Sequence, residues 1–141
     1  IMKKIIFGFS LIFIFSFLNL KADINYFQKG KSLYKEKKYD LAKFKFEQDL
    51  VFNPKNENSY LYLAKIFEFK KDENQEESNL KTVILLNPKN EEAIFHLALL
   101  KIRKSNYSES KKLLNTFKKN CLNLCQRSDE LRDKLNSITK K

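Results

Sequence analysis

A four-residue phrase that occurs twice sets the period of this chain. Asn53-Pro54-Lys55-Asn56 recurs letter for letter as Asn87-Pro88-Lys89-Asn90, so the two prolines lie 34 positions apart (88 minus 54). Proline lacks the backbone N–H that a helix needs and disfavours helical geometry in the residue before it, so each copy is expected to end a helix. A fixed period of about 20 to 50 residues is typical of repeat arrays.

The composition favours helices in every repeat. The chain has 141 residues, which is room for one domain, and it contains only two Gly and two Pro. Turn-rich β structure needs more of both residues, so an all-α fold is expected. Short polar turns at 37–38, 71–72 and 105–106 split each period into two helices. Because short connections force antiparallel neighbours, we expect helical hairpins at about 24–52, 57–86 and 91–120.

The apolar residues recur at fixed places within the period. When each unit is numbered so that its proline is position 32, the first unit has large apolar or small residues at positions 4, 8, 11, 17, 20 and 24. These are Tyr26, Gly30, Leu33, Tyr39, Ala42 and Phe46. This pattern resembles the tetratricopeptide repeat. The resemblance implies a right-handed superhelical solenoid with repeats at 23–56, 57–90 and 91–124, followed by a capping helix and basic tail at 127–141.

The later repeats depart from the family pattern at several positions, among them position 11 of the third unit, which is Lys101 and not an aromatic residue. Position 20 of the second unit is Glu76 where the family has a small residue, which predicts a looser hairpin or a shifted second helix. The third unit has Leu122 in place of proline, as terminal repeats often do. Beyond it, Ser128 is expected to cap a last helix that covers the end of the array with Leu131, Leu135 and Ile138.

The resemblance also implies a binding surface. Members of this family hold peptides or protein segments in a concave groove lined by the first helix of each hairpin. Carried onto this sequence, the groove residues are Phe27, Lys31, Tyr34, Lys35, Leu61, Lys65, Phe69, Phe95, Leu99, Ile102 and Arg103. Such a groove favours an apolar partner segment with acidic flanks. The alternative is that several of these residues pack against the cap or a neighbouring hairpin.

One branch of the family grips the C-terminal carboxylate of a chaperone with a set of lysine, asparagine and arginine side chains. The corresponding positions hold mostly other residue types here. They are Phe27, Lys31, Tyr62, Glu92 and His96. We therefore do not expect this chain to bind a chaperone tail.

The N-terminal residues have the pattern of a secretory signal peptide. Lys3 and Lys4 precede residues 5–20, which carry no charge, and Ala22 offers a cleavage site. The alternative is an uncleaved anchor. Removing residues 1–22 also removes Lys21 and lowers the net charge from +11 to +8 (11 minus 3). Export to the periplasm or cell envelope makes nucleic acid an unexpected partner, whereas peripheral contact with a membrane stays open.

Cys121 and Cys125 are the only cysteines, and His96 is the only histidine. A disulfide is one interpretation of the cysteine pair in an exported protein. On a continuous helix, however, an i, i+4 pair fits disulfide geometry poorly, which favours two free thiols. We expect no metal site, no cofactor and no enzymatic activity, because no phosphate-binding loop or catalytic constellation is present.

Together these features favour a non-catalytic interaction adaptor or scaffold of the bacterial cell envelope. One alternative is a membrane-anchored basic protein that lies on anionic lipid. Another is an accessory subunit of an envelope complex, such as an outer-membrane assembly machine.

Overall fold

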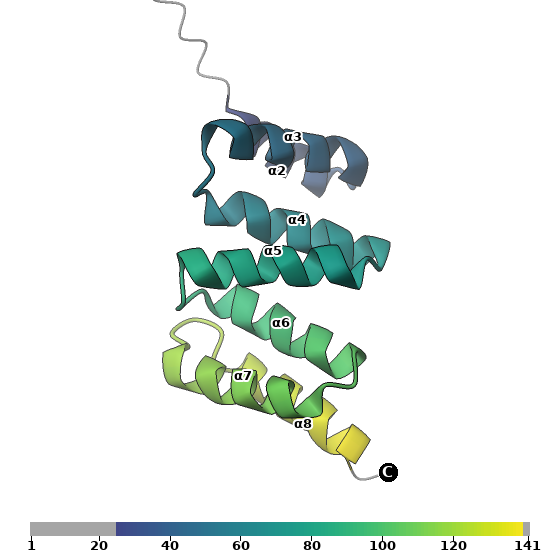
Figure 1. Cartoon of the computed structure of the whole chain (residues 1–141), viewed down its shortest axis with the longest axis vertical. Coiled ribbons are helices and arrows are strands. Elements are labelled where there is room, and N and C mark those ends of the chain that lie inside the picture. Colours follow the sequence, from purple (N-terminus) through teal and green to yellow (C-terminus); the bar gives the residue numbers. More distant parts are fainter. Residues whose placement is uncertain (1–24, 140–141) are drawn as a thin grey trace, which may run out of the picture.

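The computed structural model describes residues 25–139 and contains only helices over that range. They are α2 (Tyr26–Lys35), α3 (Tyr39–Phe52), α4 (Glu57–Lys70), α5 (Glu73–Leu86), α6 (Glu91–Arg103), α7 (Tyr107–Asn120) and α8 (Arg127–Thr139). They stack in chain order, with α2 and α3 at one end and α7 and α8 at the other (Figure 1). The predicted all-α solenoid of three antiparallel hairpins and a C-terminal helix is confirmed.

Among these helices, none has the length and apolar character to cross a membrane. The predicted signal segment at 1–22 lies outside the described residues.

The turn inside each hairpin uses one residue in left-handed backbone geometry. Lys37, Lys71 and Ser105 have φ of 59°, 59° and 58°. In the second hairpin, the N–H of Asp72 donates to the carbonyl of Phe67 at 3.0 Å, which is the bond pattern that closes a helix C-terminus. The side chain of Asp72 then caps α5 by accepting from the N–H of Gln75 at 3.1 Å. One turn therefore ends a helix and starts the next within two residues.

The repeated Asn-Pro-Lys-Asn phrase has a second role at the junctions between hairpins. Its last asparagine caps the following helix: the side-chain oxygen of Asn56 accepts from the N–H of Asn58 at 3.2 Å. The amide groups of Asn53 and Asn56 also donate to the buried carboxylate of Asp49, at 3.1 and 2.6 Å. Ser59 donates to it from α4 at 2.6 Å. The first copy thus joins two hairpins and satisfies a buried charge, which must be hydrogen-bonded to be tolerated.

A glycine allows the first hairpin to close. Gly30 of α2 is buried, and a Cβ placed on it would lie 2.7 Å from the ring of Phe46 on α3. Phe46 is fully buried, and the rings of Phe27 and Tyr62 lie 5.9 and 4.9 Å from its ring. The ring therefore has little room to move away.

Glu76 does not loosen the second hairpin, so that expectation is wrong. Its side chain is 1% exposed, and Arg103 of α6 donates to both of its carboxylate oxygens at 2.6 Å. Burial raises the pKa of Glu76 despite the guanidinium beside it. Helices α4 and α5 pack as closely as the other pairs, because the carboxylate reaches α6 and does not wedge its own hairpin apart.

The segment after the third hairpin closes the array with a disulfide. Cys121 leaves helical geometry at ψ 138°, so the two cysteines do not share a helix, and their Cα atoms lie 5.1 Å apart. The prediction of free thiols is wrong for this reason. Glu91 of α6 holds the same segment by accepting from the N–H groups of residues 122–124 at 2.7 to 3.1 Å.

Helix α8 then covers the third hairpin. Leu131 and Leu135 are buried against α6 and α7, whereas Ile138 stays 37% exposed. The helix begins at Arg127, so the prediction that Ser128 caps it is also wrong.

Candidate partner-binding surface

An open hollow of about 490 Å³ lies on the side of the stack formed by the first helix of each hairpin. We call it the inner pocket. Side chains from α2, α4 and α6 line it, with one from the start of α3 and one from the start of α8. They are Tyr34, Tyr39, Lys65, Glu68, Phe69, His96 and Arg127.

One wall of the inner pocket is aromatic. The rings of Tyr34 and Tyr39 meet edge to face at 5.4 Å, and the ring of Phe69 lies 4.4 Å from that of Tyr39. Phe69 is nevertheless 65% exposed. An aromatic side chain held by its neighbours and still open to solvent can take up an apolar group at little cost in conformational entropy.

The other wall of the inner pocket consists of charged side chains that form ion pairs within the protein. Lys65 of α4 lies 2.6 Å from Glu92 of α6. Glu68 lies 3.2 Å from both His96 Nδ1 and Arg103 Nη1. The contact with His96, together with the charge of Arg103, holds the pKa of Glu68 below its usual value. Glu68 is therefore ionised at neutral pH, and it links α4 to α6 beneath the pocket.

Arg127 enters the pocket from the first turn of α8. Its guanidinium lies 3.6 Å from the centre of the Phe95 ring, and its Nε lies 3.4 Å from Glu130. The ring contact covers Phe95 and places a cation at the end of the pocket. Because the disulfide and Glu91 hold the preceding segment, the position of this cation depends on them.

The structure divides the predicted groove residues into two groups. Those that reach the surface or are only partly buried are Phe27, Lys31, Tyr34, Lys35, Lys65, Phe69, Leu99 and Arg103. Leu61, Phe95 and Ile102 lie in the core at 5%, 0% and 8% exposure. Helix α8 explains the burial of Phe95 and Ile102, since Leu131 and Leu135 pack in the same cluster. Leu61 packs against α6, in the cluster that contains Leu97 and Leu100.

The pocket also contains side chains that were not among the predicted groove residues. They are Tyr39, His96 and Arg127. The repeat pattern places Tyr39 at a packing position, and only the contact with Phe69 shows that it has a second role. Arg127 belongs to the segment after the repeats, so no repeat position could have marked it. In residues 25–139, no group of three His, Cys, Asp or Glu side chains could hold a metal ion.

Comparison with known proteins shows the fold. No family model and no curated protein match the sequence. Among solved structures, the Yersinia enterocolitica type III secretion chaperone SycD, in complex with a peptide of the translocator YopD, superposes with a TM-score of 0.75 at 16% identity. That match covers 86% of this chain and 96% of SycD. The chain has the tetratricopeptide repeat fold.

Two further tetratricopeptide repeat structures give the same result. The first repeat domain of Spaghetti (RPAP3), bound to the HSP90 peptide SRMEEVD, superposes with a TM-score of 0.72 at 20% identity. It covers 81% of this chain and 90% of that domain. The TPR2B domain of yeast Sti1, in a pHsp70 complex, superposes with a TM-score of 0.71 at 14% identity, over 77% and 90% of the two chains.

Proposed function

We propose that this tetratricopeptide repeat protein is a non-catalytic adaptor that holds a segment of a partner protein in the inner pocket. The observation that carries the proposal is Phe69, which stays 65% exposed on an aromatic wall that the fold holds in place. The SycD and RPAP3 structures, which have the same fold, each hold a peptide. This supports peptide binding and leaves the partner of this chain to be found.

The charges suggest how the partner segment is oriented. Lys65 and Arg103 already have carboxylate partners within the protein. In the described part of the chain, Lys31 and Lys35 on α2 have none, and Lys31 lies 5.5 Å from the Phe27 ring. An apolar partner side chain therefore packs on the exposed face of Phe69, which Tyr39 supports from the other side, and acidic residues beside it face the two free lysines. Such charges add association rate and direction more than affinity.

The proposed location is the periplasmic side of a bacterial cell envelope. It rests on the pattern of residues 1–22, in which a basic start precedes 16 uncharged residues. N-terminal sequencing of the protein from an envelope fraction tests it. Recovery in the cytoplasmic fraction would contradict the proposal, and an intact residue 5–20 segment would show an uncleaved anchor.

Peptide selection tests the binding proposal. Peptides selected from a random display library on the full chain should combine one or two apolar residues with Asp or Glu. We expect the best of them to lose about tenfold or more in affinity for Phe69→Ala, because about 1.4 kcal/mol of binding energy is a factor of ten. Leu85→Ala is the matched control, since Leu85 is 81% exposed on α5 and is not one of the residues that line the pocket. Equal affinity for the wild type and Phe69→Ala would refute the pocket as the binding site.

A further inference from the structure

Helix α3 has a second apolar face that no other helix covers. Leu41, Phe44, Val51 and Phe52 are 56%, 54%, 76% and 67% exposed. At 3.6 residues per turn they fall within an arc of about 100° and span about 17 Å of the helix. We call these four residues the α3 stripe. The core face of the same helix is separate and contains Ala42, Phe46 and Asp49.

The position of the stripe at the end of the stack leaves it without a neighbour. Helices α2 and α3 form that end of the stack, and α3 packs on α2 and α4 through its other faces (Figure 1). Other strongly exposed aliphatic side chains, such as Leu85 and Leu122, lie singly on different elements. Single exposed apolar residues need no explanation, but four on one helix face, two on either side of the partly buried Gln48, mark an interaction surface.

The net charge beside the α3 stripe is positive once the ion pairs within the protein are counted. Both nearby carboxylates are neutralised: Asp40 by Lys70, and Glu47 by Lys43 at 2.6 Å. Lys45 runs along the edge, with Nζ 5.2 Å from the Phe44 ring and 5.5 Å from the Tyr26 ring. Its ammonium donates to the side-chain oxygen of Gln48 at 2.8 Å, and among the described residues it has no carboxylate partner. An apolar face with a lysine at its edge that no carboxylate neutralises is the arrangement of segments that lie in the interface of an anionic bilayer.

The chain enters the domain beside the stripe. Tyr26, the first residue of α2, stacks on Phe52 with ring centres 5.6 Å apart. Only residues 21–24 separate the uncharged residues 5–20 from the described chain, a reach of about 18 Å at most. The uncharged residues 5–20 are therefore attached to the domain at the same end as the α3 stripe.

We propose that the α3 stripe inserts into the boundary between headgroups and acyl chains of a bilayer that contains anionic lipid. The four apolar side chains enter the boundary, and Lys45 faces the lipid phosphates. None of the residues that line the inner pocket belongs to the stripe, so this contact goes beyond the proposed adaptor function and does not rest on it.

A second copy of the chain fits this surface less well than lipid does. Four side chains of this size can bury about 400 Å² per chain, whereas a stable interface takes about 800 Å². A symmetric contact between two stripes would also bring two Lys45 residues to the same apolar seam, and each chain is strongly basic. Like charges at an interface oppose association.

A single tryptophan reports on the stripe, because the natural chain has none. Full-length Phe44→Trp is mixed with vesicles of phosphatidylglycerol and brominated phosphatidylcholine, whose bromines quench tryptophan at the acyl boundary. We expect its emission to shift to the blue and to fall about twofold or more. Leu85→Trp, with its reporter on α5, should keep its emission. Vesicles without phosphatidylglycerol, or high salt, should weaken the effect on Phe44→Trp.

Every other outcome overturns the proposal. No quenching of Phe44→Trp means that the stripe does not meet lipid. Equal quenching of both variants means that binding through another part of the chain explains the contact. A blue shift before vesicles are added means that protein already covers the stripe, either a second copy or the chain's own N-terminal residues. If Phe44→Trp does not fold, Val51→Trp takes its place, since Val51 is the most exposed of the four.

Discussion

At the residue scale, Gly30 decides how closely α2 and α3 approach. An alanine Cβ there would press on the confined Phe46 ring, at 2.7 Å. Overpacking of this kind costs about 1 to 3 kcal/mol, and alanine regains about 1 kcal/mol through helix propensity. We therefore expect Gly30→Ala to lower the free energy of unfolding by about 1 kcal/mol, measured by urea denaturation.

Repeating Gly30→Ala in a protein that already carries Phe46→Leu separates the clash with the Phe46 ring from other effects of the substitution. In Phe46→Leu, the smaller side chain leaves room for the new methyl group. Gly30→Ala should then be neutral or stabilising by up to about 1 kcal/mol. The same loss in both backgrounds would show that the ring is not the cause.

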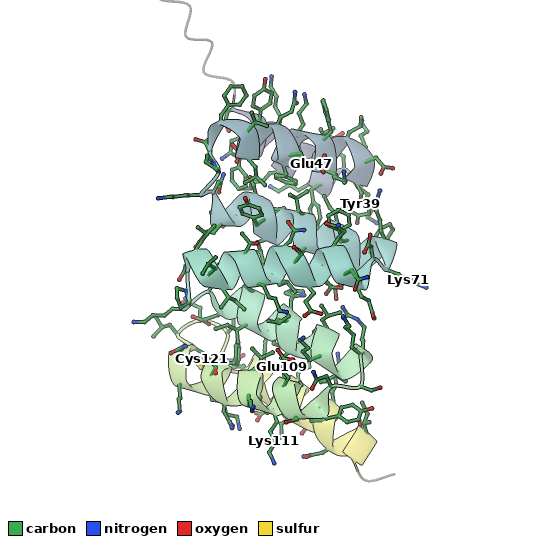
Figure 2. All side chains as sticks on the ribbon, in the orientation of Figure 1. Tyr39, Glu47, Lys71, Glu109, Lys111 and Cys121 are labelled. Carbon is green, nitrogen blue, oxygen red and sulfur yellow. A yellow bond between two sulfur atoms is a disulfide. The ribbon has the colours of Figure 1, made fainter. Side chains whose placement is uncertain are left out.

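The left-handed turn residues predict a stabilising substitution. Lys71 has φ of 59°, a conformation that glycine adopts without the steric cost of a Cβ. Figure 2 shows Lys71 at the edge of the molecule, where its side chain points into solvent. We expect Lys71→Gly to raise the free energy of unfolding by about 0.5 to 1 kcal/mol.

Lys111→Gly is the matched control for that substitution. Lys111 lies within α7 and points away from the stack (Figure 2). Glycine there should lower stability by about 1 kcal/mol. Loss of stability in both variants would contradict the role assigned to the turn.

At the scale of elements, a charged cluster joins α5, α6 and α7. The side chain of Lys101 is 7% exposed, and its ammonium lies 2.8 Å from Glu77 and 3.0 Å from Glu109. Burial alone would lower the pKa of Lys101, but these bonds outweigh it and raise the pKa. Lys101, Lys104 and Lys81 all donate to Glu77 and hold its pKa far below the usual range.

The lowered pKa of Glu77 sets the sign of a pH effect. A carboxyl whose pKa is lower in the folded state contributes stability above its unfolded pKa, which is about 4.5, and loses it as the pH falls further. We expect Glu77→Gln to lower the free energy of unfolding by about 2 kcal/mol at pH near 7. The difference between the two proteins should narrow below about pH 4.5 in urea titrations.

Glu130→Gln serves as the control for an exposed pair. Glu130 is 40% exposed and lies 3.2 Å from Lys134. Its loss should change stability by less than about 1 kcal/mol. A Glu77→Gln effect that is equally small, or that stays constant from neutral to acid pH, would contradict the cluster's role.

The disulfide is expected to stabilise α8 more than the repeats. Closing so short a loop is worth about 2 kcal/mol in the chain-entropy account. Reduction should therefore speed amide hydrogen exchange in α8, where Leu131 and Leu135 pack on the third hairpin, and leave α4 and α5 protected. Cys121→Ser with Cys125→Ser should show the same exchange pattern with or without reductant. Unchanged exchange on reduction would mean that Glu91 alone holds the segment.

At the scale of the whole molecule, the 34-residue period was enough to predict the hairpins and their turns. Helix boundaries follow from local chemistry, in which proline ends a helix and an asparagine or aspartate side chain starts the next. The packing of α8 is different in kind. It depends on contacts between segments that are far apart in sequence. The burial of Phe95 and its contact with Arg127 could therefore not be predicted from positions within the repeat.

The same limit applies to the candidate site. Position within the repeat identified Tyr34, Lys65 and Phe69, which line the inner pocket. It could not identify which basic side chains would be paired internally, because Glu92 pairs with Lys65 and Glu68 with Arg103 across neighbouring helices. Whether a repeat position carries a free or a neutralised charge is decided by the stacking of hairpins.

The central claim is that a partner segment occupies the inner pocket in the cell. A photo-crosslinking amino acid placed at Phe69 of the full chain tests it directly, with the same group at Leu85 as the control. The account predicts one discrete crosslinked protein for position 69 and none for position 85, and digestion should map the crosslink to an apolar segment with acidic flanks. No crosslink at position 69, or the same products at both positions, would contradict it.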